Sequence, residues 1–179
     1  MRHVPNILTL LRVLSVPVTV WLIVEGRMST AFWLFTFAGA TDAVDGAVAR
    51  LFNARTKLGQ WMDPLADKLL LVATYITLGT GGELPLWLAV LVVVRDVVIL
   101  FYVFVYLLAG AFSVRPILIS KINTVAQIAL VAIVLARLGL AWGGPMLTEA
   151  FIYVVAATTT ASGAAYLFSA SRRQPAARP

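Results

Sequence analysis

Residues 41–67 read T-D-A-V-D-G-A-V-A-R-L-F-N-A-R-T-K-L-G-Q-W-M-D-P-L-A-D, and this stretch contains the main constraint on the architecture. It places four aspartates, Asp42, Asp45, Asp63 and Asp67, in segments that otherwise read as membrane-spanning. A carboxylate at the bilayer centre costs at least about 2.5–3.5 kcal/mol on insertion scales, so an opposite charge must share the site. Carboxylates are hard oxygen ligands that suit Mg²⁺ or Mn²⁺. The stretch therefore predicts a metal-dependent catalytic centre at the edge of a membrane.

The composition is that of an integral membrane protein. Of 179 residues, 61% are hydrophobic and 12% are charged, and the mean hydropathy is +0.93. A soluble domain is about 45–50% apolar and about 25% charged. Cysteine is absent, which excludes disulfide and thiolate chemistry. The net charge is +6, and the basic residues cluster beside apolar segments, so we expect contact with anionic lipid headgroups and no nucleic-acid partner.

Apolar windows of about 20 residues predict an all-α bundle of six transmembrane helices. The expected spans are 6–25, 29–51, 58–79, 85–109, 118–140 and 147–169. We expect one membrane domain over residues 1–170, followed by a polar, disordered cytoplasmic tail over 171–179. The first span contains Pro5, Arg12 and Pro17, so an interfacial helix bent into a shorter spanning one is the alternative. No small-residue cleavage site follows it, which favours a retained helix over a signal peptide.

The distribution of lysine and arginine predicts the orientation. These residues concentrate at the N-terminal end, in the second and fourth loops and in the tail, which places both termini and the aspartates on the cytoplasmic side. Because no Arg- and Ser-rich presequence is present, the expected location is a bacterial inner membrane. Near the end of the chain, small residues from Ala156 to Ala165 suit close helix packing or a subunit contact.

The spacing of the motif residues predicts two helical faces that meet. Asp42, Asp45, Gly46 and Ala49 share one face of the second span, and Gly59, Asp63 and Asp67 share one face of the third. The short polar loop between the spans predicts antiparallel neighbours, so the carboxylates converge. Such a quartet can hold one or two divalent cations and leave one oxygen free as a base.

The residues between the aspartates suit a phosphate ligand. Gly46 and Gly59 remove side-chain bulk where a phosphate or nucleotide needs close backbone approach. Arg50 can pair with phosphate oxygens through its fork of donors. The alternatives are acids in salt bridges, acids in a solvated loop, or an ion or proton carrier. A carrier needs no phosphate-sized gap, so the glycines and the Ala-Arg pair argue against it.

The pattern D-x2-D-G-x2-A-R-x8-G-x3-D-x3-D, from Asp42 to Asp67, resembles the signature of the CDP-alcohol phosphotransferases at every position. The resemblance implies a six-helix membrane bundle that dimerises, and a reaction in which an alcohol hydroxyl displaces CMP from a CDP-linked donor. It implies metal binding by the four aspartates and proton acceptance from the alcohol by Asp67. It also implies that the donor site is lined by Gly46, Ala49, Arg50 and Gly59.

Further segments extend the resemblance over nearly the whole chain and indicate the acceptor. V-V-R-D-V-V-I and R-P-I-L-I-S-K-I-N-T-V-A-Q look most like the CMP-forming cardiolipin synthases, which implies CDP-diacylglycerol and phosphatidylglycerol as substrates. The alternative is a phosphatidylglycerophosphate synthase that uses glycerol 3-phosphate. Those relatives tend to read G-K-x-K-T where this chain reads S-K-I-N-T at residues 120–124. One basic residue fewer suits an acceptor with a single phosphodiester charge.

The remaining polar residues each have two interpretations. Binding of a lipid phosphate is one interpretation for a set of seven: Asn6, Thr9, Arg12, Arg95, Arg115, Lys121 and Asn123. For the residues of the first span the alternative is capping and anchoring of that helix, and for Arg115 and Lys121 it is positive-inside anchoring. Arg95 and Asp96 have the alternative of pairing with neighbouring helices. Lys68 lies off the aspartate face, where we expect it to extend toward the membrane surface.

Overall fold

The computed structural model describes residues 4–52, 57–108 and 118–172, and these form six α-helices. The helices are α1 (Val4–Val24), α2 (Met28–Phe52), α3 (Lys57–Thr80), α4 (Leu86–Leu108), α5 (Leu118–Leu140) and α6 (Pro145–Arg172). The predicted all-α class is confirmed, and each predicted span lies within three residues of a helix at both ends. The apolar segments and the polar, Gly- or Pro-containing separators between them therefore predict the helix boundaries to within three residues.

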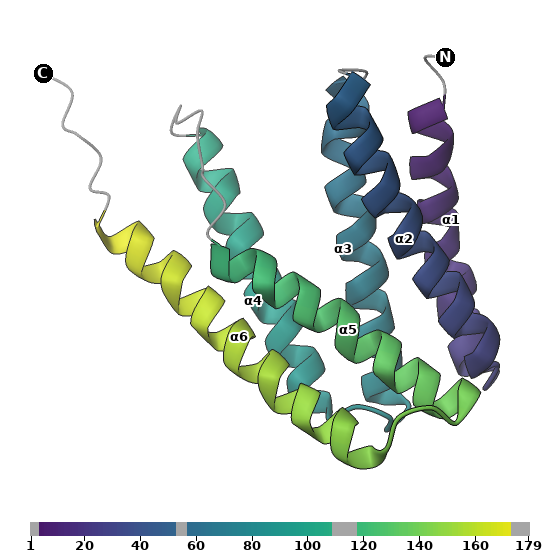
Figure 1. Ribbon diagram of the computed structural model, residues 1–179. Helices are drawn as coiled ribbons and strands as arrows, with labels where there is room; N and C mark the ends of the chain where they lie inside the picture. Colours follow the sequence, from purple (N-terminus) through teal and green to yellow (C-terminus); the bar gives the residue numbers. More distant parts are fainter. Residues whose placement is uncertain (1–3, 53–56, 109–117, 173–179) are drawn as a thin grey trace, which may run out of the picture.

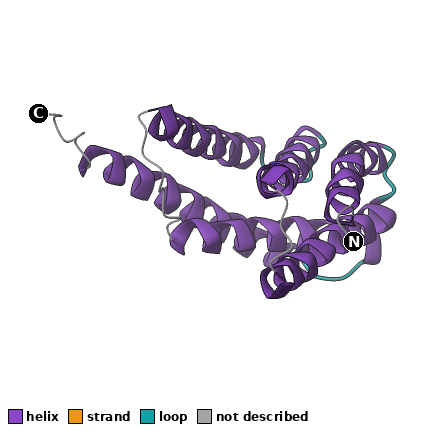
Figure 2. Ribbon diagram, turned by 90° about the horizontal axis from the view of Figure 1, so that it is seen from above, coloured by secondary structure: helices purple, strands orange, loops and turns teal. Residues whose placement is uncertain are grey.

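The helices form two layers, which the two views in Figures 1 and 2 show from the side and from above. In one layer α3 packs between α1 and α4, and in the other α5 packs between α2 and α6. Contacts of α1 with α2, of α3 with α5 and of α4 with α6 join the layers. Helices that are distant in sequence, such as α2 and α5, therefore lie side by side.

The connections alternate between the two ends of the bundle. In Figure 1 the N-terminal end of α1, the last turns of α2, the first turns of α3 and the end of α4 point toward the same end. The turns after α1, α3 and α5 lie at the opposite end. The first of them is closed by Gly26, whose φ of +71° is left-handed and whose N–H donates to the carbonyl of Ile23. The aspartate-bearing halves of α2 and α3 thus lie at one end of the bundle, on antiparallel helices. That these two helices are direct neighbours stays a prediction.

The core lies where the layers meet. Its largest fully buried side chains include Tyr75, Leu78, Leu88, Leu130 and Leu135. The Tyr75 hydroxyl donates a hydrogen bond of 3.2 Å to the backbone carbonyl of Gln127, which links α3 to α5. In water, burial of such a side chain contributes roughly 1.5–3 kcal/mol to stability. In a bilayer the hydrophobic effect between helices is absent, and van der Waals packing of these side chains holds the helices together instead.

Two of the helices in the described residues are long and apolar enough to cross a membrane by themselves. They are Leu118–Leu140, with a mean hydropathy of 1.9, and Pro145–Phe168, with a mean hydropathy of 1.4. Helix α1 is continuous through Pro17. Helix α6 continues to Arg172, the second residue of the predicted tail. The predicted tail otherwise lies outside the described residues.

A close helix crossing joins α5 to α2. A Cβ atom at Gly139 would lie 2.3 Å from the backbone nitrogen of Ser29 and 2.6 Å from the carbonyl carbon of Met28. The Ser29 hydroxyl donates a 2.7 Å hydrogen bond to the Gly139 carbonyl across the same contact. Only glycine fits at position 139, because the obstacle is backbone and cannot rotate away.

We expect Gly139→Ala to separate α5 from α2 and to destabilise the bundle by about 1–3 kcal/mol, the usual cost of overpacking. The measurement is the midpoint of thermal denaturation of the purified protein in detergent. Gly39→Ala is the matched control on α2, because a Cβ there meets nothing within 4 Å. The control should leave the midpoint unchanged or raise it, since alanine has the higher helix propensity. Equal midpoints for the two variants would contradict the close crossing.

Candidate functional site

The four signature aspartates lie on two helices at one end of the bundle. Asp42 and Asp45 belong to the second half of α2, and Asp63 and Asp67 belong to the first half of α3. Both helices are continuous through these positions, so the spacings i, i+3 and i, i+4 place each pair on one helical face. The alternative of aspartates in a solvated loop is therefore wrong.

Of this quartet, the structure describes the side chain of Asp67, which is partly buried. The side chains of Asp42, Asp45 and Asp63 lie outside the described ones, as do those of Ala49 and Arg50. Gly46 and Gly59 are located only as positions on α2 and α3. Among the side chains that are described, no three acidic, histidine or cysteine groups cluster. The predicted metal and donor sites therefore stay predictions.

The predicted phosphate-binding residues divide in the same way. Asn6, Thr9 and Arg12 are helical positions of α1 whose side chains are not described, and Arg115 lies outside the described residues. Lys121 is exposed on the first turn of α5. Arg95 and Asn123 are buried within the bundle. Lipid phosphate binding stays a prediction for all seven residues.

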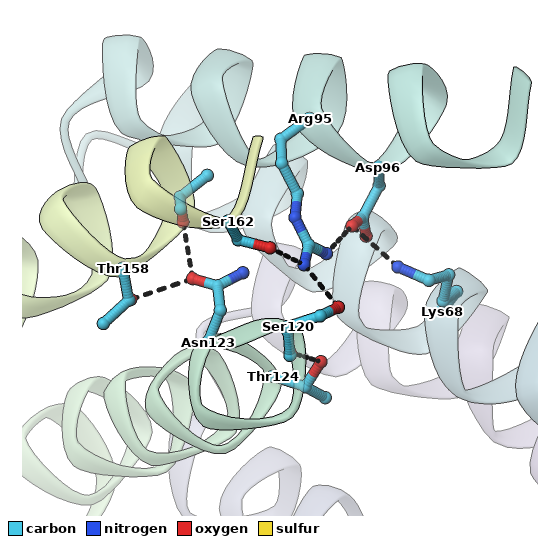
Figure 3. A network of polar contacts seen from close by, with 9 residues as sticks. Lys68, Arg95, Asp96, Ser120, Asn123, Thr124, Thr158 and Ser162 are labelled. Carbon is cyan, nitrogen blue, oxygen red and sulfur yellow. Dashed lines mark hydrogen bonds and ion pairs between the residues drawn. The ribbon is translucent and has the colours of Figure 1, made fainter. Parts of the chain in front are cut away.

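A polar network surrounds Asp96 in the interior, and Figure 3 shows it. One carboxylate oxygen of Asp96 lies 2.7 Å from the ammonium nitrogen of Lys68 on α3 and 2.6 Å from a guanidinium nitrogen of Arg95 on α4. The side chains of Arg95 and Asp96 are 4% and 5% exposed. Lys68 therefore does not extend toward the membrane surface as predicted, because a buried carboxylate on the neighbouring helix attracts its ammonium group.

Arg95 connects this pair to two more helices. Its other terminal nitrogen donates to the hydroxyl of Ser120 on α5 at 2.7 Å and to that of Ser162 on α6 at 2.5 Å. Pairing with neighbouring helices, the alternative given for Arg95, is the arrangement in the structure. Two cations and one carboxylate give these three side chains a formal charge of +1, which a low-dielectric interior screens poorly.

Asn123 joins α5 to α6 one turn away from Ser120. Its side-chain carbonyl oxygen accepts hydrogen bonds from Thr158 at 2.9 Å and from Thr159 at 2.8 Å. Thr159 and Ser162 are fully buried, so the small-residue segment of α6 packs against α4 and α5 of the same chain. Close helix packing, one of the two roles predicted for that segment, is confirmed.

Sequence reasoning missed two parts of this network: the partner of Lys68 and the use of Ser120 and Ser162 as acceptors. The sequence does contain one signal for the pair: Lys68 and Asp96 are opposite charges in two apolar segments. Charged side chains buried in a membrane usually pair with one another. The residue pattern within one helix does not show which other helices it packs against. The contact of α3 with α4, which brings Lys68 to Asp96, could therefore be found only from the structure.

Comparisons with known proteins place the chain in a family. Residues 2–161 match the family described as CDP-alcohol phosphatidyltransferase. Cardiolipin synthase (CMP-forming) from Homo sapiens is 33% identical over 91% of this chain and 60% of its own length. A cardiolipin synthase (CMP-forming) / mitochondrial hydrolase fusion protein from Schizosaccharomyces pombe is 33% identical over 92% of this chain and 30% of its own.

The name of a third relative gives a different acceptor, glycerol 3-phosphate. It is CDP-diacylglycerol–glycerol-3-phosphate 3-phosphatidyltransferase 1, chloroplastic, from Oryza sativa subsp. japonica, and it is 33% identical over 92% of this chain and 56% of its own length. The chain thus spans from 30% to 60% of the length of these relatives. The family match covers most of the chain and includes the complete aspartate signature, so the chain belongs to the CDP-alcohol phosphatidyltransferase family.

Proposed function

We propose that this protein is an enzyme that transfers the phosphatidyl group of CDP-diacylglycerol to phosphatidylglycerol, giving cardiolipin and CMP. The observation that carries the proposal is the complete aspartate signature within a chain that is 33% identical, over 91% of its length, to a CMP-forming cardiolipin synthase. The relative from Schizosaccharomyces pombe with the same activity in its name supports the same acceptor.

The donor set fits one or two divalent cations. It consists of carboxylates alone, on two antiparallel helices at one end of the bundle, and oxygen-only sites suit Mg²⁺ or Mn²⁺. In this proposal Asp42, Asp45, Asp63 and Asp67 hold the metal. Bound divalent cations would neutralise the pyrophosphate and make CMP a better leaving group. Gly46, Ala49, Arg50 and Gly59 line the site of the cytidine diphosphate group.

Asp67 is the proposed general base. The acceptor hydroxyl oxygen forms a bond to the phosphorus of the phosphatidyl group, and the bond from that phosphorus to the bridging pyrophosphate oxygen breaks. CMP leaves with the electron pair, and the hydroxyl proton passes to Asp67. A carboxylate that is strongly engaged by metal binds protons weakly, so this role requires Asp67 to be the least engaged of the four.

Six membrane spans with both termini in the cytoplasm are part of the proposal. Even the shortest helix, α1, has 21 residues, which corresponds to about 32 Å at 1.5 Å per residue and matches a hydrocarbon core of about 30 Å. The exposed face of α4 is apolar along its described length: Leu86, Trp87, Val90, Val94, Val97, Leu100 and Phe101. A protein in water rarely exposes a continuous apolar face of this length, whereas contact with lipid tails accommodates one. A homodimer in a bacterial inner membrane completes the proposal.

Two other functions have specific support. The glycerol-3-phosphate-dependent relative from Oryza sativa favours a phosphatidylglycerophosphate synthase as the second candidate. An ion or proton carrier is the non-enzymatic candidate, because acidic residues in membrane helices also mark transport paths. The family assignment argues against the carrier.

An acceptor panel tests the proposal. Purified protein in lipid nanodiscs with Mn²⁺ or Mg²⁺ should release CMP from CDP-diacylglycerol when phosphatidylglycerol is present, and chelation of the metal should abolish the release. The measurements are CMP by chromatography and the lipid product by mass spectrometry. Turnover with glycerol 3-phosphate and none with phosphatidylglycerol would establish the second candidate. Ion flux into proteoliposomes without CMP release would establish the carrier.

Substitution of Asp67 tests its role as the base. Asp67→Asn keeps the shape of the side chain and one metal-ligating oxygen, but the amide cannot accept the proton of the acceptor hydroxyl. We expect turnover to fall by about 10²–10⁴, the usual effect of losing a general base, while binding of CDP-diacylglycerol is partly retained. Asp42→Asn and Asp45→Asn should instead weaken metal and nucleotide binding together. Near-normal turnover of the Asp67→Asn enzyme would remove the base assignment and leave the metal assignment intact.

A further inference from the structure

Lys68, which forms an ion pair with Asp96, directly follows the proposed base Asp67 in the sequence. Lys68 is next to Asp67 on α3, and its ammonium nitrogen lies 2.7 Å from the Asp96 carboxylate on α4. The side chain of Lys68 is 31% exposed, whereas that of Asp96 is 5% exposed. A partly accessible cation on the active-site helix is thus held by an anion that belongs to the interior of the bundle.

We propose that Lys68 is a positioning residue, which fixes the rotation and height of α3 and thereby the place of Asp67. The inference rests on the proposed function for the role of Asp67, but the fixing of α3 stands on the geometry of the network. Lys68 is not proposed to touch the substrate or the reacting atoms.

The first argument is that Asp96 is itself held in place. Arg95 contacts the same carboxylate oxygen at 2.6 Å and reaches Ser120 on α5 and Ser162 on α6. Through these contacts the ammonium group of Lys68 is tied to α4, α5 and α6 together. In Figure 3 Lys68 enters this network from one side and Ser162 from the other, with Asp96 and Arg95 between them.

The second argument is that α3 needs such a restraint. A helix with an apolar surface in an apolar solvent has no hydrophobic force that selects its rotation, so packing and interhelical polar contacts must do so. A rotation or an axial shift of α3 moves Lys68 and Asp67 together, because they are consecutive residues of one rigid helix. Restraining the first therefore restrains the second.

The third argument concerns magnitude. An exposed ion pair contributes little to stability, but here the carboxylate is buried in a low-dielectric interior, where the pair is screened far less. A misplacement of about 1 Å in a catalytic group can lower a rate by about 10²-fold. A contact that contributes modestly to stability can thus contribute strongly to turnover.

The test compares Lys68→Met with Lys68→Arg in the purified full chain, under the conditions of the CMP assay. Lys68→Met leaves the pair of Arg95 with Asp96 intact, so no buried cation loses its partner and the variant should fold. We expect its kcat to fall by about tenfold to 100-fold, with KM for both lipids within about twofold. Lys68→Arg, which keeps the cation, should recover most of kcat.

The matched control removes another ion pair, which joins the turn between α3 and α4 to α5. Glu83 and Arg137 lie 3.3 Å apart at the opposite end of the bundle, and both are partly exposed. Glu83→Gln should therefore leave kcat and KM unchanged. A rise in KM of Lys68→Met at constant kcat would assign Lys68 to substrate binding and overturn the proposal, and so would an unchanged kcat.

A second measurement is independent of activity. The chain has no cysteine, so a Leu69→Cys, Leu167→Cys pair on exposed positions of α3 and α6 can carry two spin labels without background. Lys68→Met on this background should broaden or shift the distance distribution between the labels. An unchanged distribution would overturn the proposal whatever the activity. A parent protein that releases no CMP would instead refute the proposed function, and the distance measurement alone would decide whether Lys68 fixes α3.

Discussion

The arrangement of α3, α4, α5 and α6 depends on a single buried carboxylate. The side chain of Asp96 is 5% exposed, and the groups that compensate its charge are the cations of Lys68 and Arg95. A carboxylate without such partners would cost several kcal/mol in the interior of a protein. Arg95 compensates this charge from within α4, whereas Lys68 reaches it from α3, and Arg95 in turn donates to Ser120 on α5 and Ser162 on α6. Apolar contacts such as those around Leu88 and Leu130 tolerate small shifts, whereas ion pairs and hydrogen bonds of 2.5–2.7 Å tolerate less.

The helices themselves could be predicted from the sequence, because each is an apolar segment that ends at a polar, Gly- or Pro-containing separator. The end of α1 shows the physical reason: Gly26 supplies the left-handed φ that closes the helix. Helix α6 continues three residues past the predicted end of its span at 169, because Ser171 and Arg172 are polar but are compatible with a helix. The two layers could not be predicted, since the choice of neighbours depends on close crossings such as that of Gly139 with Ser29.

In the candidate site, too, the arrangement within each helix could be predicted and the contacts between helices could not. Sequence spacing placed Asp42 with Asp45, and Asp63 with Asp67, on helical faces, and the continuous helices α2 and α3 agree with that placement. The partner of Lys68 was missed, since Asp96 is 28 residues away and only the packing of α3 on α4 joins them. Local patterns thus carry information on which groups share a helix. They carry none on which helix lies opposite.

Position 123 bears on the choice of acceptor in a way that the sequence alone did not reveal. The side chain of Asn123 is fully buried, and its carbonyl oxygen accepts hydrogen bonds from Thr158 and Thr159. It approaches α6 one turn from Ser162, to which Arg95 donates. A lysine at position 123, the residue that glycerol 3-phosphate-dependent relatives tend to have, would place a further cation near Lys68, Arg95 and Asp96, whose formal charges already sum to +1. Such a charge requires an additional anion nearby, and a phosphomonoester would supply it. Asparagine gives the helix contact without that requirement, which favours an acceptor with a single phosphodiester charge.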